Sequence, residues 1–168
     1  DLYSYAIQYL LLIINPTIIF TAYCIATHNI TIGLIEVFSF LLIRKYCGGY
    51  HCQSSTVCLI FSAIMLIGIA WLSSFIKPSL YMFIVLIIAD AELIIKGPVI
   101  SVNHSVLDSE KKYYHRWLIS ILAVFNIIII AATVLHLYRT ASCISIVIIF
   151  CFISHIACMT EKNRKLYY

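Results

Sequence analysis

The sequence predicts an all-α, polytopic membrane protein with about six transmembrane helices. Of the 168 residues, 63% are hydrophobic and only 11% are charged, and the mean hydropathy is +1.03. These values lie outside the range of ordinary soluble domains. The apolar residues are gathered in six segments, most of them close to the ~20 residues that cross the hydrocarbon core of a bilayer. We therefore expect one membrane-embedded domain that covers residues 1–168.

The expected spans follow one another along the chain as residues 5–26, 30–43, 57–76, 79–95, 117–137 and 142–159. The second span is the shortest and carries Glu36. Neither a basic region nor a small-residue cleavage site precedes the first span, so it does not resemble a removable signal peptide. Because the chain begins at Asp1 rather than at a methionine, we expect a further N-terminal segment to precede it.

Polar residues separate the spans in alternating short and long intervals. Short turns join the spans in pairs at residues 27–29, 76–79 and 138–140. Two longer polar intervals, 44–56 and 96–116, follow the second and the fourth span. The short turns offer few functional side chains, so any chemistry is expected in the two long intervals.

The basic residues predict the orientation in the membrane. If the first span starts from the cytoplasm, nine of the eleven Lys and Arg residues are cytoplasmic, and only Lys77 and Arg139 lie outside. This asymmetry follows the positive-inside rule and places both long intervals, 44–56 and 96–116, in cytoplasmic loops. It also accounts for the net charge of +4, so nucleic acid is not expected as a partner.

The seven cysteines do not indicate a disulfide framework, because their number is odd and their spacing is scattered. Four of them lie inside expected spans, where a thiol packs like a small apolar group. The other three, Cys47, Cys52 and Cys58, lie in or beside the first long interval and face the reducing cytoplasm. With His51 they match a zinc site in number, but their spacing fits no standard zinc motif, so no metal and no cofactor is expected.

The segment RKYCGGYHCQSSTVC, residues 44–58, carries the candidate catalytic residues. Gly48 and Gly49 allow positive φ, interrupt the second span and let an extended peptide approach the main chain. The Ser and Thr residues that follow are candidate N-caps, which places Cys58 in the first turn of the third span. There, unpaired amides and the positive end of the helix dipole favour an anionic sulfur.

His51 and Cys58 are seven residues apart, which corresponds to about 10 Å along a continuous helix. The imidazole can therefore take the thiol proton only if the chain folds back between the two residues. The same residues also fit an ordinary cytoplasmic turn with a solvated histidine and a cysteine that begins a buried span. The motif alone does not decide between the two interpretations.

The segment resembles the signature of the accessory gene regulator B family, which has an Arg, a Gly-Gly-x-His and a Cys seven residues after the His. The hydropathy of the whole chain resembles the family as well. The second long interval is more loosely similar: residues 97–99 and Asn103 match the family's Pro-and-Asn motif, whereas His104 and Ser105 stand where Lys-Pro is usual. The amphipathic N-terminal segment that is usual in the family is absent.

This resemblance implies a thiol protease of the bacterial cytoplasmic membrane with its active site on the cytoplasmic side. Such an enzyme cleaves the precursor of a quorum-sensing peptide pheromone near its C-terminus, with Cys58 as the nucleophile and His51 as the base. The upstream part of the precursor is held as a thioester, and an internal cysteine of the peptide then closes a thiolactone ring. The implied partners are the precursor peptide, the lipid bilayer and a second copy of the chain in a homodimer.

Further residues are expected to bind the precursor or to shape the loop at residues 44–56. Arg44 matches the family's Arg and suits a precursor carboxylate, while Gly48 and Gly49 shape the loop. Lys111, Lys112 and Arg116 suit an acidic precursor tail, although positive-inside topology predicts the same basic cluster.

The alternative function is a small polytopic transporter in which intramembrane carboxylates bind an ion or carry protons. Its candidates are Glu36, Asp90 and Glu92. The last two are two residues apart, so on a helix they point in different directions and do not make a good pair. A transporter would need these carboxylates and tolerate the loss of Cys58, whereas a peptidase needs Cys58 and His51. A membrane scaffold would need neither set.

Overall fold

The computed structural model describes residues 2–48, 55–98 and 108–165. These residues form six helices: α1 (Leu2–Ala26), α2 (Ile30–Cys47), α3 (Ser55–Leu72), α4 (Leu80–Lys96), α5 (Asp108–Val134) and α6 (Tyr138–Lys165). The predicted all-α fold is therefore confirmed, and the helices follow the order of the expected spans.

The fifth and sixth helices are longer than the hydropathy predicts. α5 begins at Asp108 rather than at residue 117, and α6 covers Tyr138–Lys165 rather than 142–159. Hydropathy marks only the apolar part of a helix, whereas the backbone hydrogen bonds continue through polar residues beyond the hydrocarbon core. As a result, the second half of the interval 96–116 is helical rather than a loop, and its basic residues stand on the first turns of α5.

The helices present large apolar side chains to their surroundings. Within the described residues, the segments Glu110–Val134 and Tyr138–Thr160 are long and apolar enough to cross a membrane, and Ile14–Ala26 and Thr56–Leu72 are shorter apolar segments. Exposed large apolar side chains, most often isoleucine, occur on each of the six helices. A surface of this kind is suited to lipid rather than to water.

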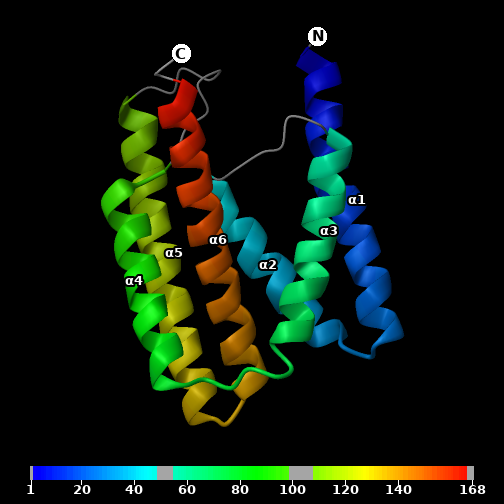
Figure 1. Ribbon diagram of the computed structural model, residues 1–168, viewed down its shortest axis with the longest axis vertical. Coiled ribbons are helices and arrows are strands. Elements are labelled where there is room, and N and C mark those ends of the chain that lie inside the picture. The colour runs from blue at the N-terminus through cyan, green and yellow to red at the C-terminus, as the bar shows by residue number, and fades with distance from the viewer. Residues whose placement is uncertain (1, 49–54, 99–107, 166–168) are drawn as a thin grey trace.

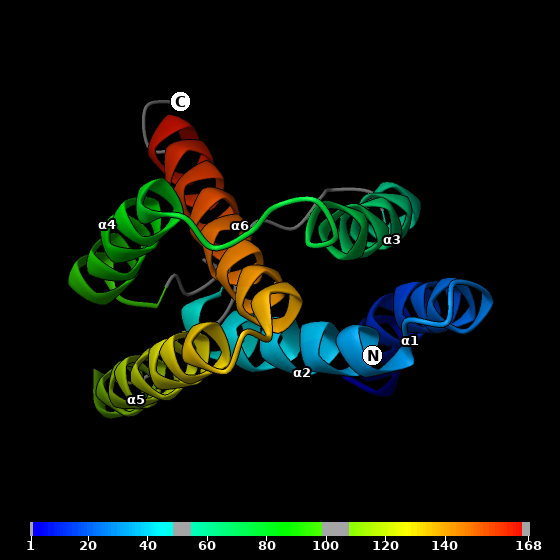
Figure 2. The ribbon, with the colours of Figure 1, turned by 90° about the horizontal axis from the view of Figure 1, so that it is seen from below.

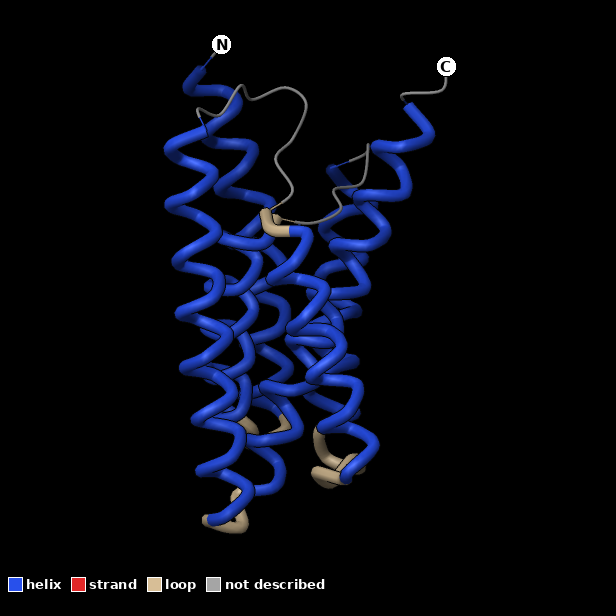
Figure 3. The backbone as a smooth tube through the Cα atoms, turned by 90° about the vertical axis from the view of Figure 1, so that its left-hand side faces the viewer, coloured by secondary structure: helices blue, strands red, loops and turns tan. Residues whose placement is uncertain are grey.

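The helices alternate in direction along the bundle. As a result, α2 and α4 end, and α3 and α5 begin, at the end drawn at the top of Figure 1, which we call the upper end. The short connections between α1 and α2, α3 and α4, and α5 and α6 lie at the opposite, lower end, as Figure 3 also shows. The helix ends that flank the two long polar intervals therefore lie together at the upper end.

α6 is the central helix, and it packs against α2, α3, α4 and α5 (Figure 2). On one side, α1 packs against α3 and α2. The buried core runs along α2, α5 and α6, where Ile43, Leu118 and Ile144 are almost fully buried.

α2 and α6 run parallel to each other and make polar contacts at three levels. From the lower to the upper end, these contacts are Arg139 Nη1 to Asn29 Oδ1 at 2.6 Å, Cys143 Sγ to Glu36 Oε2 at 3.9 Å, and Arg44 Nη1 to Ser154 Oγ at 3.5 Å. Small side chains in the lower part of α6, including Ala141 and Ser145, are fully buried and allow the two helices to approach closely.

Candidate active site

Cys58 lies in the first turn of α3, which begins at Ser55, as the sequence predicts. Its side chain is 9% exposed and forms part of the wall of a cavity of about 120 Å³. We call this cavity the Cys58 pocket. It lies between three helices and is lined by Phe40 and Arg44 of α2, by Cys58, Phe61, Ser62 and Met65 of α3, and by Phe150, Ile153, Ser154 and Ala157 of α6.

Arg44 brings a positive charge to this mostly apolar pocket. Its guanidinium donates a hydrogen bond to Ser154 of α6 at 3.5 Å and lies 5.6 Å from the ring centre of Phe40. The aromatic face attracts the cation, and the hydroxyl accepts from it. The structure therefore brings two of the predicted site residues, Arg44 and Cys58, into one pocket.

α2 ends at Cys47, less than one turn after Arg44, and Gly48 caps it. Gly48 has φ +73° and donates its backbone N–H to the carbonyl of Arg44 at 3.1 Å. Glycine adopts this left-handed region without the penalty that a Cβ would bring. Cys47 is fully buried, and its thiol donates to the carbonyl of Gly48 at 2.9 Å. Gly49 and His51 lie outside the described residues, so the pairing of His51 with Cys58 stays a prediction.

The predicted basic cluster does not line the pocket. Lys111, Lys112 and Arg116 are exposed on the first turns of α5 at the upper end. α5 packs against α2 and α6 and lies on the far side of these helices from α3 (Figure 2). The basic cluster and the Cys58 pocket therefore lie on opposite sides of the α2–α6 pair.

The three intramembrane carboxylates lie apart and have separate partners. Glu36 is fully buried and accepts a hydrogen bond from the thiol of Cys143. The others pair with neighbours on or beside α4: Asp90 accepts from Asn126 at 2.7 Å, and Glu92 lies 2.8 Å from Lys96. Because they do not converge, the arrangement gives no support to a transporter site. Among the described residues, no group of three His, Cys, Asp or Glu side chains is placed to hold a metal ion.

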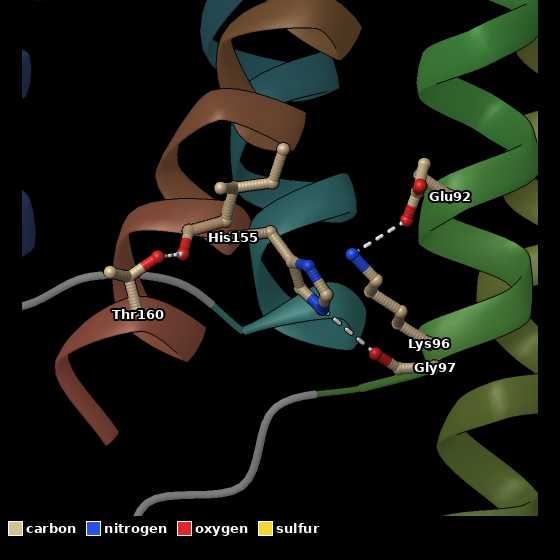
Figure 4. A network of polar contacts seen from close by, with 6 residues as sticks. Glu92, Lys96, Gly97, His155 and Thr160 are labelled. Atoms are coloured by element: carbon tan, nitrogen blue, oxygen red, sulfur yellow. Dashed lines mark hydrogen bonds and ion pairs between the residues drawn. The ribbon is translucent and has the colours of Figure 1, made fainter. Parts of the chain in front are cut away.

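His155 is a buried polar residue of α6 that is not among the predicted site residues. Its side chain is 1% exposed, and Nε2 lies 2.9 Å from the carbonyl oxygen of Gly97 (Figure 4). Because a carbonyl only accepts, Nε2 carries the proton. A buried imidazole in an apolar span needs a hydrogen-bond partner. The presence of a histidine in the sixth span is therefore the sequence signal that could have indicated this contact.

Gly97 ends α4 in the same way that Gly48 ends α2. It has φ +67° and donates its N–H to Leu93 O at 3.1 Å. A Cβ at this position would lie 2.9 Å from Nδ1 of His115. His155 follows directly after Ser154 in α6, so one turn of this helix contacts the upper ends of both α2 and α4.

These features define a small polytopic membrane protein with a cysteine and an arginine in one pocket near the upper end of the bundle. The family model of accessory gene regulator B (AgrB) matches residues 1–156. The chain therefore belongs to this family, whose members are membrane peptidases that process the precursor of a quorum-sensing peptide. Comparisons with curated proteins and with solved structures gave no match.

Proposed function

We propose that this chain is a cysteine endopeptidase that cleaves the pheromone precursor near its C-terminus, with Cys58 as the nucleophile and His51 as the base. The observation that carries the proposal is the place of Cys58, at a helix start and in the wall of a pocket that also holds Arg44. Cys143 and Cys151, by contrast, are buried among the helices and do not line this pocket.

In the first step, His51 takes the proton of the Cys58 thiol, and the sulfur attacks the carbonyl carbon of the scissile peptide bond. The carbon–nitrogen bond breaks, and the C-terminal fragment leaves as an amine after receiving the proton from His51. The first backbone N–H groups of α3 lack acceptors within the helix, so they are suited to stabilise the oxyanion. The upstream part of the precursor remains bound to Cys58 as a thioester.

In the second step, an internal cysteine of the precursor attacks the thioester carbonyl. A new carbon–sulfur bond closes the thiolactone ring, the bond to Cys58 breaks, and the Cys58 thiol is restored. Exchange of one thioester for another is nearly isoenergetic, so the ring forms only while water is kept away. Burial of Cys58 among apolar side chains supports this requirement, and a bound peptide brings the two reacting groups together.

The remaining site residues have supporting roles in this proposal. Arg44 binds a carboxylate or carbonyl of the precursor through guanidinium N–H groups other than the one that donates to Ser154. Gly48 and Gly49 shape the loop that carries His51. Lys111, Lys112 and Arg116 hold an acidic part of the precursor outside the pocket. The upper end faces the cytoplasm, as the positive-inside rule predicts, and the enzyme works as a homodimer.

The test uses the full chain in nanodiscs with its cognate precursor. We expect Cys58→Ser and His51→Ala to lower cleavage by at least about a thousandfold, because each removes one partner of the nucleophile–base pair. Mass spectrometry of the peptide fragments measures cleavage, and hydroxylamine releases any thioester from the protein.

Cys143→Ser is the matched control, because its hydroxyl can still donate to Glu36 while the pocket is unchanged. This variant should keep its activity within a few-fold of the wild type. Cleavage that continued in folded Cys58→Ser would contradict the proposal.

A further inference from the structure

The Cys58 pocket also has a size and a lining that limit what can bind beside the nucleophile. We propose that it receives the side chain of the precursor residue whose carbonyl carbon Cys58 attacks, and that it selects an aliphatic side chain of about the size of leucine over alanine and tryptophan. This inference rests on the proposed function and adds a specificity-determining pocket to it.

The lining favours an apolar occupant. Aromatic and aliphatic side chains from all three helices surround the cavity, among them Phe61, Met65 and Ile153. Two of its polar groups, on Arg44 and Ser154, already form a hydrogen bond with each other. An apolar side chain that enters loses contact with water and leaves that bond intact, whereas a polar side chain would lack partners along most of the wall.

The volume sets an upper limit on the occupant. The cavity measures about 120 Å³, and an apolar cavity of about 150 Å³ in another protein holds one benzene molecule. A branched side chain of four carbons therefore fits the space. The indole of tryptophan is larger than benzene, so it would force the surrounding side chains to move, and overfilling of this kind is unfavourable. The methyl group of alanine would leave most of the pocket empty.

The position of Cys58 in the wall identifies which residue of the precursor is selected. In the residue that supplies the carbonyl, the Cα is bonded directly to the carbon that the sulfur attacks. In the residue that leaves, the amide nitrogen separates the Cα from that carbon. Because Cys58 lines the cavity itself, the nearer side chain, on the acyl side, is the one that enters.

Two lining residues can be changed without disturbing the buried core. Phe61 of α3 is 53% exposed, and Ala157 of α6 is also exposed, yet both border the pocket. Phe61→Ala should enlarge the pocket, and Ala157→Leu should fill it. Ile64→Ala on α3 likewise truncates an exposed apolar side chain, and Ala91→Leu on α4 repeats the change made at Ala157, both at exposed positions away from the pocket.

The experiment uses three acetylated amino-acid aldehydes with the side chains of alanine, leucine and tryptophan. The Cys58 thiol adds to the aldehyde carbon, a carbon–sulfur bond forms, and the proton moves to the oxygen to give a hemithioacetal. Bound aldehyde protects Cys58 from alkylation by iodoacetamide, which peptide-resolved mass spectrometry measures in the full chain in nanodiscs. The result for each aldehyde is the concentration that halves the alkylation rate.

We expect the leucine aldehyde to protect at a concentration at least about tenfold lower than the alanine and tryptophan aldehydes, because single methylenes in apolar pockets change selectivity by about this factor. Ala157→Leu should remove the advantage of leucine, and Phe61→Ala should improve protection by tryptophan. The two control variants should keep the wild-type order. Protection is compared with each variant's own alkylation rate without aldehyde, and thermal unfolding in detergent shows that each variant is folded.

Equal protection by all three aldehydes, or an order that neither pocket variant changes, would overturn the pocket assignment while the reaction of Cys58 still supports the proposed function. If Cys58 reacted with neither the aldehydes nor iodoacetamide, the proposed function itself would fail, and the pocket assignment would fail with it.

Discussion

The lower and upper parts of the parallel α2–α6 pair are built from the same two helices, but only the upper part contains the Cys58 pocket. In the lower part, Glu36 and Cys143 are fully buried, and small side chains hold the helices close together. In the upper part, Arg44 and Ser154 also form a polar contact, but large side chains such as Phe40 and Phe150 border a cavity. A polar contact between membrane helices therefore does not define a site, and the size of the neighbouring side chains decides whether space remains for a ligand.

The largest expected effect tests whether the lower part of the α2–α6 pair excludes water. Glu36→Lys would place a cation in a fully buried position, and we expect it to lower the free energy of unfolding by about 3 kcal/mol or to prevent accumulation in the membrane. Glu36→Gln keeps the shape and an acceptor, so it should cost about 1 kcal/mol or less. Thermal unfolding in detergent measures both. Equal stability of Glu36→Lys and wild type would show that water reaches this position.

A smaller effect tests how closely α1 approaches the lower part of α2. A Cβ on Gly33 of α2 would overlap the sulfur of Cys24 in α1, so Gly33→Ala should destabilise the protein by about 1–3 kcal/mol. The double variant Gly33→Ala with Cys24→Ala should recover much of this loss, because the overlap is removed.

Gly68→Ala on α3 is the matched control, since nothing lies within 4 Å of its Cβ position. It should be neutral or slightly stabilising, because alanine favours helix formation over glycine. Melting temperatures in one detergent compare the three variants, and equal losses at Gly33 and Gly68 would argue against tight packing in the lower part.

The smallest expected effect concerns the upper part, where His155 holds the end of α4. His155→Leu removes the donor to Gly97 and should cost about 1 kcal/mol, the scale of hydrogen bonds between membrane helices. In His155→Gln an amide N–H can replace the imidazole donor, so it should recover part of the loss. Thermal unfolding provides the measurement, and a larger loss in the glutamine variant than in the leucine variant would contradict this role.

Much of the fold follows from the sequence, because long apolar segments in a bilayer must be helices that satisfy their own backbone. The order of the helices and the place of Cys58 in the first turn of α3 were predicted in this way and are confirmed. The start of α5 was misplaced because its first turns are polar and helical at the same time.

The lining of the pocket could not be predicted. Ser154 and Phe150 lie far from Cys58 along the chain, and they reach it only because α6 packs against both α2 and α3. Hydropathy reports how deep a side chain lies in the membrane, but not which helix it faces. The contact between His155 and Gly97 escaped prediction for the same reason.

Ser154 and His155 are consecutive residues, so their side chains leave α6 about 100° apart. One meets Arg44 near the end of α2 and the other meets Gly97 at the end of α4. A rotation of α6 about its axis would break both contacts together, and a rotation in the reverse direction would restore both. The upper ends of α2 and α4 are thus torsionally coupled through one helix, and a precursor that turned α6 would shift both of them in the same movement.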